Sequence, residues 1–245
     1  MSTPIFLQVA LNGDSVHPAT PRTPEAIAED ALAVMRAGAH AVHVHAFDQA
    51  GRETLDPLAC GQVLRAIRSL CPGLPISLTT SAAIESDPAR RLRQIQAWEE
   101  LPDQVSANQG EVGIVPLCEH LLSRGVQIEA GLLSVDDARA FVASGLGPHC
   151  RRILVEALDL DATTALAHAA AMEEVVRAAG MTLEQVHHGD GPACWAIHQR
   201  ALERGHGIRT GLEDVTVLPD GSPALDNRDL TVAARRRIAS FPELA

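Results

Sequence analysis

The chain has 245 residues, with 31 acidic and 20 basic side chains and a formal net charge of −11. An acidic balance of this size disfavours nucleic acids and anionic membranes as partners. Every basic residue is an arginine and there is no tyrosine, which excludes a lysine Schiff base, a P-loop lysine and a tyrosine acid or nucleophile.

Short apolar runs typical of β-strands alternate with longer helical stretches along the chain. The helices often begin where a capping side chain precedes a proline, as at Thr23-Pro24, Asp56-Pro57 and Asp87-Pro88. The predicted strands span residues 5–11, 41–45, 76–79, 104–107, 127–130, 152–155, 185–188 and 207–212. The helices predicted after them span residues 24–38, 57–70, 87–100, 113–124, 135–144, 162–179, 192–204 and 226–239.

Eight such β/α units in a chain of this length predict an α/β fold, a single (β/α)8 TIM barrel that forms one domain over residues 1–245. A doubly wound open sheet is the alternative. It is disfavoured because the turns after the strands lack a G-x-G-x-x-G fingerprint.

The cellular compartment can also be predicted from the sequence. The first eleven residues lack the charged segment and the long apolar run of a signal peptide. No apolar stretch reaches the roughly eighteen residues of a membrane span. The five cysteines form no C-x-x-C pair, which is typical of a reducing compartment. We therefore expect a cytoplasmic protein with no membrane partner.

Alternation along the strands separates an apolar face from a polar one. Apolar side chains fit the face that packs under helices, so the polar residues are expected to point toward the barrel axis. The faces of the strands at 152–155 and 185–188 cannot be assigned in this way. The inward polar residues predicted late in their strands, where barrel active sites lie, are His43, His45, Ser77, Thr79, Ser106, Asn108, Glu129, Arg209 and Glu213.

His43 and His45 are the strongest local signal. Two histidines at i and i+2 on a strand point the same way and can share one cation, and catalytic zinc commonly has three protein ligands. Glu213, at the end of the last strand, is the third ligand we expect. In a closed barrel only the first strand separates the last strand from the second strand, which carries the two histidines. His187 and His188 are competing candidates, and a pair of polar residues near a strand end is the simpler alternative for the two histidines.

Arg209 and Asp214 lie close to this predicted metal ligand. Arg209 shares the inward face with Glu213, and an inward arginine needs an anion, either a neighbouring carboxylate or a substrate carboxylate. Asp214 follows Glu213 directly, so it can act as a general base, support a neighbouring side chain or only cap the following turn.

At these residues the sequence resembles the β-keto acid cleavage enzymes. The H-x-H pair and the R-x-G-L-E-D segment, about 165 residues apart, are the most specific part of the resemblance. The matching segments run in family order over nearly the whole chain and are Ala10-Leu-Asn-Gly13, Val42-His-Val-His45, Thr79-Thr80, Ser106-Ala-Asn108, Glu129-Ala-Gly131, His188-Gly-Asp-Gly191 and Gly205-His-Gly-Ile-Arg-Thr-Gly-Leu-Glu-Asp214.

The resemblance implies a zinc-dependent barrel, usually a homo-oligomer such as a dimer or tetramer. It implies condensation of a β-keto acid with acetyl-CoA, followed by cleavage to acetoacetate and the CoA ester of the shortened acid. Carried over by position, the zinc ligands are His43, His45 and Glu213, and Asp214 is the general base with Arg209 beside it. The residues expected to contact substrate are Thr79, Ser106, Asn108, Glu129 and His188.

The sequence also departs from the family pattern. Family members carry a glutamate two residues after the glycine that matches Gly13, where this chain has Ser15. Two alternatives therefore stay open beside the acyltransferase. One is a metal-dependent lyase or aldolase that does not use CoA, and the other is a non-catalytic barrel that only binds a metal or ligand.

Overall fold

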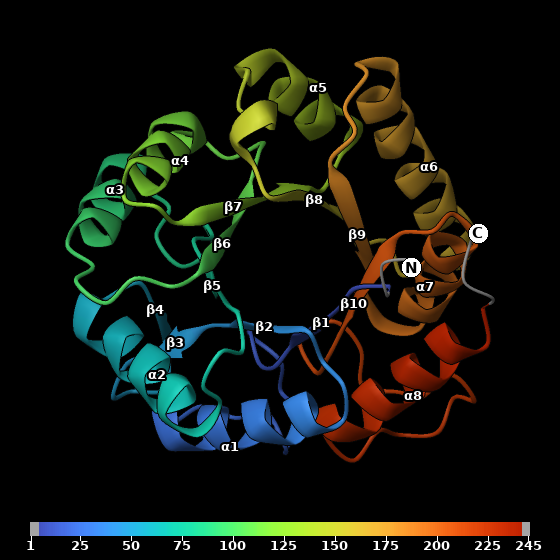
Figure 1. Cartoon of the computed structure of the whole chain (residues 1–245), viewed down its shortest axis with the longest axis horizontal. Coiled ribbons are helices and arrows are strands. Elements are labelled where there is room, and N and C mark those ends of the chain that lie inside the picture. Colours follow the sequence, from blue (N-terminus) through green and yellow to red (C-terminus); the bar gives the residue numbers. More distant parts are fainter. Residues whose placement is uncertain (1–4, 242–245) are drawn as a thin grey trace.

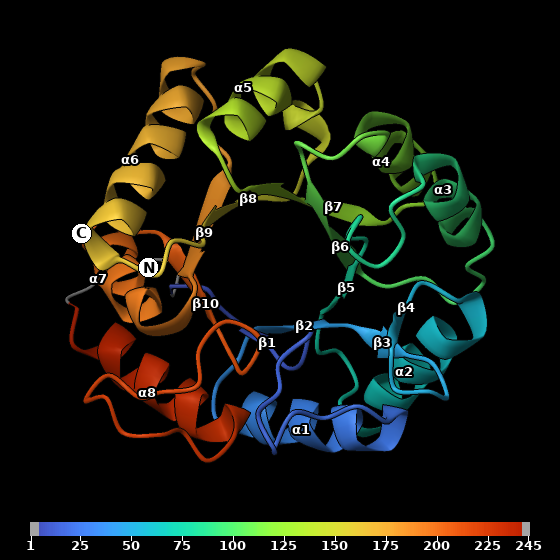
Figure 2. The same ribbon diagram turned by 180° about the vertical axis from the view of Figure 1, so that it is seen from behind.

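The computed structural model describes residues 5–241, which form a closed barrel of eight parallel strands surrounded by helices. Figures 1 and 2 show the ring of strands from its two ends, with the helices outside it. Around the ring the strands follow the order β1-β10-β9-β8-β7-β6-β5-β2. The (β/α)8 barrel predicted from the sequence is confirmed, and the open sheet is excluded because the ring closes between β1 and β2.

The bounds of the elements agree closely with the prediction. The barrel strands are β1 Leu7–Ala10, β2 Ala41–Val44, β5 Ile76–Thr79, β6 Gln104–Asn108, β7 Gln127–Leu132, β8 Arg152–Ala157, β9 Glu184–Gly189 and β10 Gly207–Thr210. The helices are α1 Pro24–Arg36, α2 Pro57–Leu70, α3 Pro88–Gln96, α4 Ile114–Ser123, α5 Val135–Ser144, α6 Ala162–Ala178, α7 Cys194–Glu203 and α8 Asn227–Ala239, with short 3₁₀ turns at Gly147–His149 and Gly191–Ala193.

The predicted helix starts owe their position to side-chain caps. Thr23, Asp56 and Asp87 each accept hydrogen bonds from backbone N–H groups of the first turn, and a proline follows each of them at the first helical position. These caps satisfy donors that a helix otherwise leaves unpaired. The carboxylate of Asp56, for example, accepts from two backbone N–H groups at 3.0 and 3.1 Å.

Three elements differ from the prediction, and the first two of them concern the site. A short antiparallel hairpin, β3 Ala46–Phe47 with β4 Glu53–Thr54, follows β2 and was not predicted. The strand β10 ends at Thr210 instead of residue 212, so Glu213 lies in the turn beyond the strand. The helix α3 ends at Gln96, four residues before the predicted end at residue 100, and Trp98 is buried in the loop that follows.

The core has an apolar outer layer and a polar interior. Val9, Val42, Leu78 and Val105 lie fully buried on the alternate face of their strands, within the cluster packed against the helices. Inside the barrel, Gln8 of β1 donates to both oxygens of Glu129 of β7 at 3.0 Å. Because these two strands stand on opposite sides of the ring, their contact crosses the barrel axis.

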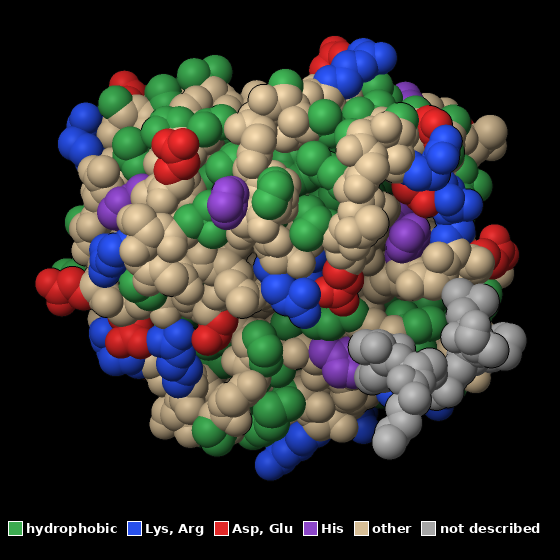
Figure 3. Space-filling view, turned by 45° about the horizontal axis from the view of Figure 1, so that its top comes forward, with side chains coloured by type: hydrophobic (Ala, Val, Ile, Leu, Met, Phe, Trp, Pro, Cys, Tyr) green, Lys and Arg blue, Asp and Glu red, His purple; other side chains and the backbone are tan. Residues whose placement is uncertain are grey.

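The surface mixes charges of both signs. On the face drawn in Figure 3, arginine and acidic side chains lie beside one another among hydrophobic ones. Between residues 5 and 241, none of the helices combines the length and the apolar composition that crossing a membrane requires.

Candidate functional site

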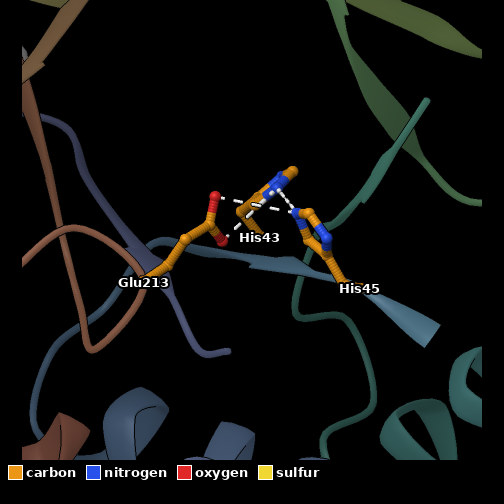
Figure 4. A group of neighbouring side chains, drawn as sticks. All are labelled: His43, His45 and Glu213. Atoms are coloured by element: carbon orange, nitrogen blue, oxygen red, sulfur yellow. Dashed lines mark hydrogen bonds and ion pairs between the residues drawn. The ribbon is translucent and has the colours of Figure 1, made fainter. Parts of the chain in front are cut away.

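His43, His45 and Glu213 converge inside one end of the barrel (Figure 4). The two histidine Nε2 atoms lie 3.1 Å apart. The Glu213 carboxylate oxygens lie 3.7 Å from Nε2 of His43 and 3.7 Å from Nε2 of His45. His43 on β2 and His45, the first residue after that strand, both point inward, and the turn after β10 brings Glu213 from the other end of the chain.

This triad, His43, His45 and Glu213, has the geometry of a three-ligand cation site. Ligand atoms 2.0–2.1 Å from a tetrahedral zinc ion lie about 3.3–3.4 Å from one another, close to the distances found here. Within the described residues, the buried Oε2 of Glu213 has no hydrogen-bond partner. The donor set of two imidazoles and one carboxylate is one that zinc commonly takes at catalytic sites.

The charge states of the triad differ from those of exposed side chains. Burial lowers the pKa of His43 to about 3, which keeps its ring neutral and able to offer a lone pair. Burial opposes charge on Glu213 as well, but Arg209 and the two histidines outweigh it and hold the pKa of the carboxyl well below its usual range. The site therefore presents an ionised carboxylate beside a neutral imidazole.

His43 is supported by a buried polar network. Its Nδ1 lies 3.3 Å from the Ser77 hydroxyl, which donates to Glu129 at 2.5 Å. Glu129 is fully buried and also pairs with Arg152 at 3.1 Å. This network orients the His43 ring through its Nδ1 atom, and both oxygens of Glu129 accept hydrogen bonds from other side chains of the protein.

His45 is supported by a carboxylate that sequence reasoning missed. Its Nδ1 lies 2.5 Å from Oε1 of Glu53, which comes from β4 of the hairpin. Burial opposes charge on His45, but Glu213 and Glu53 together outweigh it and raise its pKa to about 9. Periodicity along β2 could not reveal Glu53, because two-residue strands carry no periodic signal.

Arg209 and Asp214 form an ion pair next to the triad. Arg209 Nη2 donates to Oδ1 of Asp214 and to Oε1 of Glu213, each at 2.7 Å, and its Nε donates to Oδ2 of Asp214 at 3.1 Å. Burial disfavours the charge on Asp214, but Arg209 and His188 lower the pKa of the carboxyl to about 2. Asp214 is therefore ionised at neutral pH and fixed beside the triad.

The two histidines of β9 face opposite ways. His188 lies inside the barrel, with Nδ1 3.4 Å from Asp214 and Nε2 3.5 Å from Glu156. His187 faces outward and stacks on His206 with the rings 4.8 Å apart. The two strands whose faces the sequence left unassigned thus contribute Glu156 and His188 to the interior.

The interior side chains Glu156, His188, Arg209, Glu213 and Asp214 line a cavity of about 240 Å³. A larger cavity, of about 800 Å³, is lined by residues that include Phe6, Gln104, Gln127 and Arg152, which lie before or at the beginning of their strands. Barrel active sites lie at the opposite end. The residues that line the smaller cavity are Asp14, Glu156, Leu158, His188, Gly189, Asp190, Arg209, Glu213 and Asp214.

Four of the predicted substrate contacts do not line this cavity. Thr79 accepts a hydrogen bond from the backbone N–H of Ser81 at 3.3 Å, and Asn108 donates to Glu111 at 3.1 Å. Ser106 is a buried residue in the middle of β6, and Glu129 belongs to the polar network that contacts His43 through Ser77. Their contact with substrate remains a prediction.

The structure also shows the surroundings of Ser15, which stands where the family pattern has a glutamate. The Ser15 hydroxyl accepts from the backbone N–H of His17 at 3.4 Å. The neighbouring residue, Asp14, lines the cavity with Asp190. A carboxylate is therefore present one residue earlier in the same loop.

A second group with ligand-type side chains, Glu173, His187 and His206, lies outside the barrel ring. The Glu173 carboxylate already pairs with Arg204 at 2.5 Å and with His206 at 3.2 Å, and Arg200 pairs with it too. Two guanidinium groups beside one carboxylate repel a further cation. This group is better explained as an ion-pair network that ties α6, α7 and the turn before β10.

Comparison with known proteins identifies relatives. The family model described as "beta-keto acid cleavage enzyme" matches residues 4–243. A curated protein named 3,5-dioxohexanoate:acetyl-CoA acetone transferase, from Paraburkholderia graminis, is 33% identical over 113 residues, which cover 45% of this chain and 36% of that protein. The 3-keto-5-aminohexanoate cleavage enzyme of Fusobacterium nucleatum is 30% identical over 105 residues, covering 41% and 39%.

Solved structures show the same fold. The ternary complex of ObcA with a C4-CoA adduct and oxalate superposes with a TM-score of 0.72 at 18% identity, over 91% of this chain and 64% of that one. The matched regions thus span well under half of the two curated relatives and less than two thirds of ObcA.

Proposed function

The chain belongs to the beta-keto acid cleavage enzyme family, and we propose that it transfers the acyl group of a β-keto acid to CoA at the expense of acetyl-CoA. In the proposed reaction, R–CO–CH₂–COO⁻ and acetyl-CoA give acetoacetate and R–CO–CoA. The carboxymethyl carbons of acetoacetate come from the β-keto acid and its acetyl group comes from acetyl-CoA. The names of the two curated relatives, an acetyl-CoA-dependent transferase and a cleavage enzyme, support this reaction.

One observation carries the proposal. The triad of His43, His45 and Glu213 lies directly beside the Arg209–Asp214 ion pair, and that pair lines the same cavity as Glu213. We propose that the triad holds a zinc ion. Zinc would supply a Lewis acid that polarises carbonyl oxygens and offsets developing negative charge.

Asp214 is the general base of the proposed mechanism. Its carboxylate accepts a proton from the carbon between the two carbonyl groups of the β-keto acid, and the resulting enolate attacks the acetyl-CoA carbonyl and displaces the CoA thiolate. The thiolate then attacks the R–CO carbon, the bond from that carbon to the former CH₂ carbon breaks, and Asp214 returns the proton to the acetoacetate that leaves. Arg209 holds both Asp214 oxygens and so fixes the direction in which the base points. Neither residue forms a covalent bond to the substrate, consistent with a chain that has no lysine or tyrosine.

The proposed substrate contacts are Thr79, Ser106, Asn108, Glu129 and His188. His188 has the most direct support, because it lines the cavity and its ring lies between Glu156 and Asp214. Burial opposes charge on His188 and so does Arg209, but the two carboxylates outweigh them and raise its pKa to about 9. A protonated His188 would offer an N–H donor near the base.

We also propose that the chain forms a homo-oligomer, a dimer or tetramer, in the cytoplasm. Exposed apolar side chains in the loops that follow barrel strands support an interface there; they include Val16, Val112, Leu160 and Leu225. Light scattering on the purified protein measures the subunit number.

The experiment that tests the function incubates the zinc-loaded protein with acetyl-CoA and a panel of β-keto acids. We expect loss of acetyl-CoA matched by a new CoA ester and by acetoacetate, all absent with Asp214→Asn. Cleavage of the acid at the same rate without acetyl-CoA would instead support a lyase or aldolase. Zinc binding with no turnover of any acid would support a non-catalytic barrel.

A further inference from the structure

The β3–β4 hairpin brings a carboxylate to the rear of the His45 ring. Glu53 Oε1 lies 2.5 Å from Nδ1 of His45. Both atoms are buried, and neither has a further hydrogen-bond partner among the described residues. The ion pair is therefore the sole polar contact seen for the ring nitrogen that faces away from the triad.

The hairpin is built so that this contact forms. His45 is followed at once by β3, and the register pairs Phe47 with Glu53 and Ala46 with Thr54, which returns the chain beside the histidine after eight residues. Asp48 fixes the turn between the two strands. Its Oδ1 accepts from the backbone N–H groups of Ala50 and Arg52 at 2.8 and 2.9 Å, and its Oδ2 pairs with the Arg52 side chain at 2.8 Å.

The backbone of His45 is fixed separately. The Asn12 side chain accepts from the His45 N–H at 2.9 Å and donates to the His45 carbonyl at 3.0 Å. These bonds fix the position of the residue but leave the rotation of its ring open. The ring itself is constrained by contacts at its two nitrogens, with His43 and Glu213 near Nε2 and Glu53 at Nδ1.

We propose that Glu53 is a positioning residue that holds a proton of His45 on Nδ1, so that Nε2 is the nitrogen that gives up its proton and binds the metal. This inference rests on the proposed role of the triad. A carboxylate behind a ligating histidine fixes the tautomer and the ring orientation and makes the ligand more basic. His43 differs, because its Nδ1 faces the neutral hydroxyl of Ser77 at 3.3 Å. Of the two histidines, His45 alone has a carboxylate at its Nδ1, and the β3–β4 hairpin supplies it.

Glu53 is not itself a fourth ligand in this arrangement. It contacts the Nδ1 side of the ring, whereas the triad gathers on the Nε2 side, and Glu53 is not within the group of atoms that can share one ion. Its effect on the metal passes through His45. Replacing it is therefore expected to weaken metal binding without removing a ligand.

The test measures zinc affinity by competition with a chromogenic chelator, using zinc alone. For Glu53→Ala we expect an affinity about 10- to 100-fold weaker than that of the unchanged protein. For Glu53→Gln we expect a smaller loss, because the amide oxygen still accepts from Nδ1–H. The matched control is Arg52→Ala, which removes the exposed side-chain pair with Asp48 but keeps the backbone hydrogen bonds of the turn, and should change zinc affinity by no more than about twofold.

His43→Ala separates this inference from the proposed metal site. If His43→Ala binds zinc as tightly as the unchanged protein, the triad is not the metal site and the proposed function fails with it. If His43→Ala loses zinc but Glu53→Ala does not, only the role of Glu53 is overturned. An equal loss for Arg52→Ala and Glu53→Ala would also overturn it, since the loss would then not depend on the Glu53 carboxylate. Circular dichroism checks the fold, and Glu53→Gln decides the matter if Glu53→Ala does not fold.

Discussion

Gly13 lies so close to Glu213 that a Cβ at its position would displace the glutamate side chain. A Cβ on Gly13 would lie 2.6 Å from Cγ of Glu213, and the backbone φ of +59° is in the left-handed region that favours glycine. The loop after the first strand and the turn after the last strand therefore meet at this contact. Their fit sets where the Glu213 carboxylate points.

Gly13→Ala is expected to weaken zinc binding by displacing Glu213. It should lower zinc affinity about tenfold or more and cost about 1–3 kcal/mol of folding free energy from the strained backbone. Chelator competition and urea unfolding measure the two effects. The matched control is Gly125→Ala, where φ is +80° but no heavy atom lies within 4 Å of the added Cβ. It should cost folding free energy and leave zinc affinity unchanged; equal zinc affinity in the two variants would contradict this account of the contact.

The alternation of side chains along the strands was enough to predict much of the triad. The i and i+2 spacing puts His43, on β2, and His45, just after it, on the same side, and closure of the barrel brings Glu213 near them. The structure places these three side chains together as expected. Their role as metal ligands is a proposal.

Other parts of the site could not be predicted because they depend on loops or on a choice between neighbours. Glu53 reaches His45 through a turn whose shape follows from local hydrogen bonds of Asp48, not from periodicity. His187 and His188 are adjacent, so sequence alone does not say which faces inward. The contacts of His188 with Glu156 and Asp214, which line the same cavity, settle it.

Asp214→Asn is expected to abolish turnover while zinc binding persists. The amide keeps the shape of the side chain but cannot accept a proton, so kcat should fall by about 10²- to 10⁴-fold. Zinc content should not change, because Asp214 is outside the triad. Metal analysis and steady-state kinetics on the same sample test this. Unchanged kcat would show that Asp214 is not the base.

His206→Ala is expected to leave zinc content unchanged. The group of Glu173, His187 and His206 has ligand-type side chains, but Arg200 and Arg204 occupy the carboxylate. Metal analysis of this variant beside His43→Ala compares the two candidate groups directly. If His206→Ala lost its zinc and His43→Ala retained it, the metal would be bound by Glu173, His187 and His206, and the proposed site would be wrong.

Asp30 is expected to make stability depend on pH. Burial outweighs the hydrogen bond from Asn227, at 2.6 Å, and raises the pKa of the Asp30 carboxyl from 3.8 to about 6. Between about pH 4 and pH 6 the folded state holds a proton that the unfolded chain has released, so this group destabilises the fold as pH rises through that window.

Asp30→Asn should remove this dependence. Its amide oxygen still accepts from Asn227, and the variant should gain about 1–2 kcal/mol over the unchanged protein between pH 4 and pH 7, after allowance for the partial exposure of the side chain. Urea unfolding of both proteins at several pH values measures the difference. Parallel stability curves across this range would show that Asp30 ionises normally.

The most direct test of the proposed function follows the carbon atoms. Zinc-loaded protein is given a β-keto acid that it consumes and acetyl-CoA labelled with ¹³C at the acetyl carbonyl, and the products are examined by NMR. The account predicts the label at the keto carbon of acetoacetate and an unlabelled CoA ester of the shortened acid. Unlabelled acetoacetate, or cleavage of the acid with labelled acetyl-CoA left intact, would contradict it.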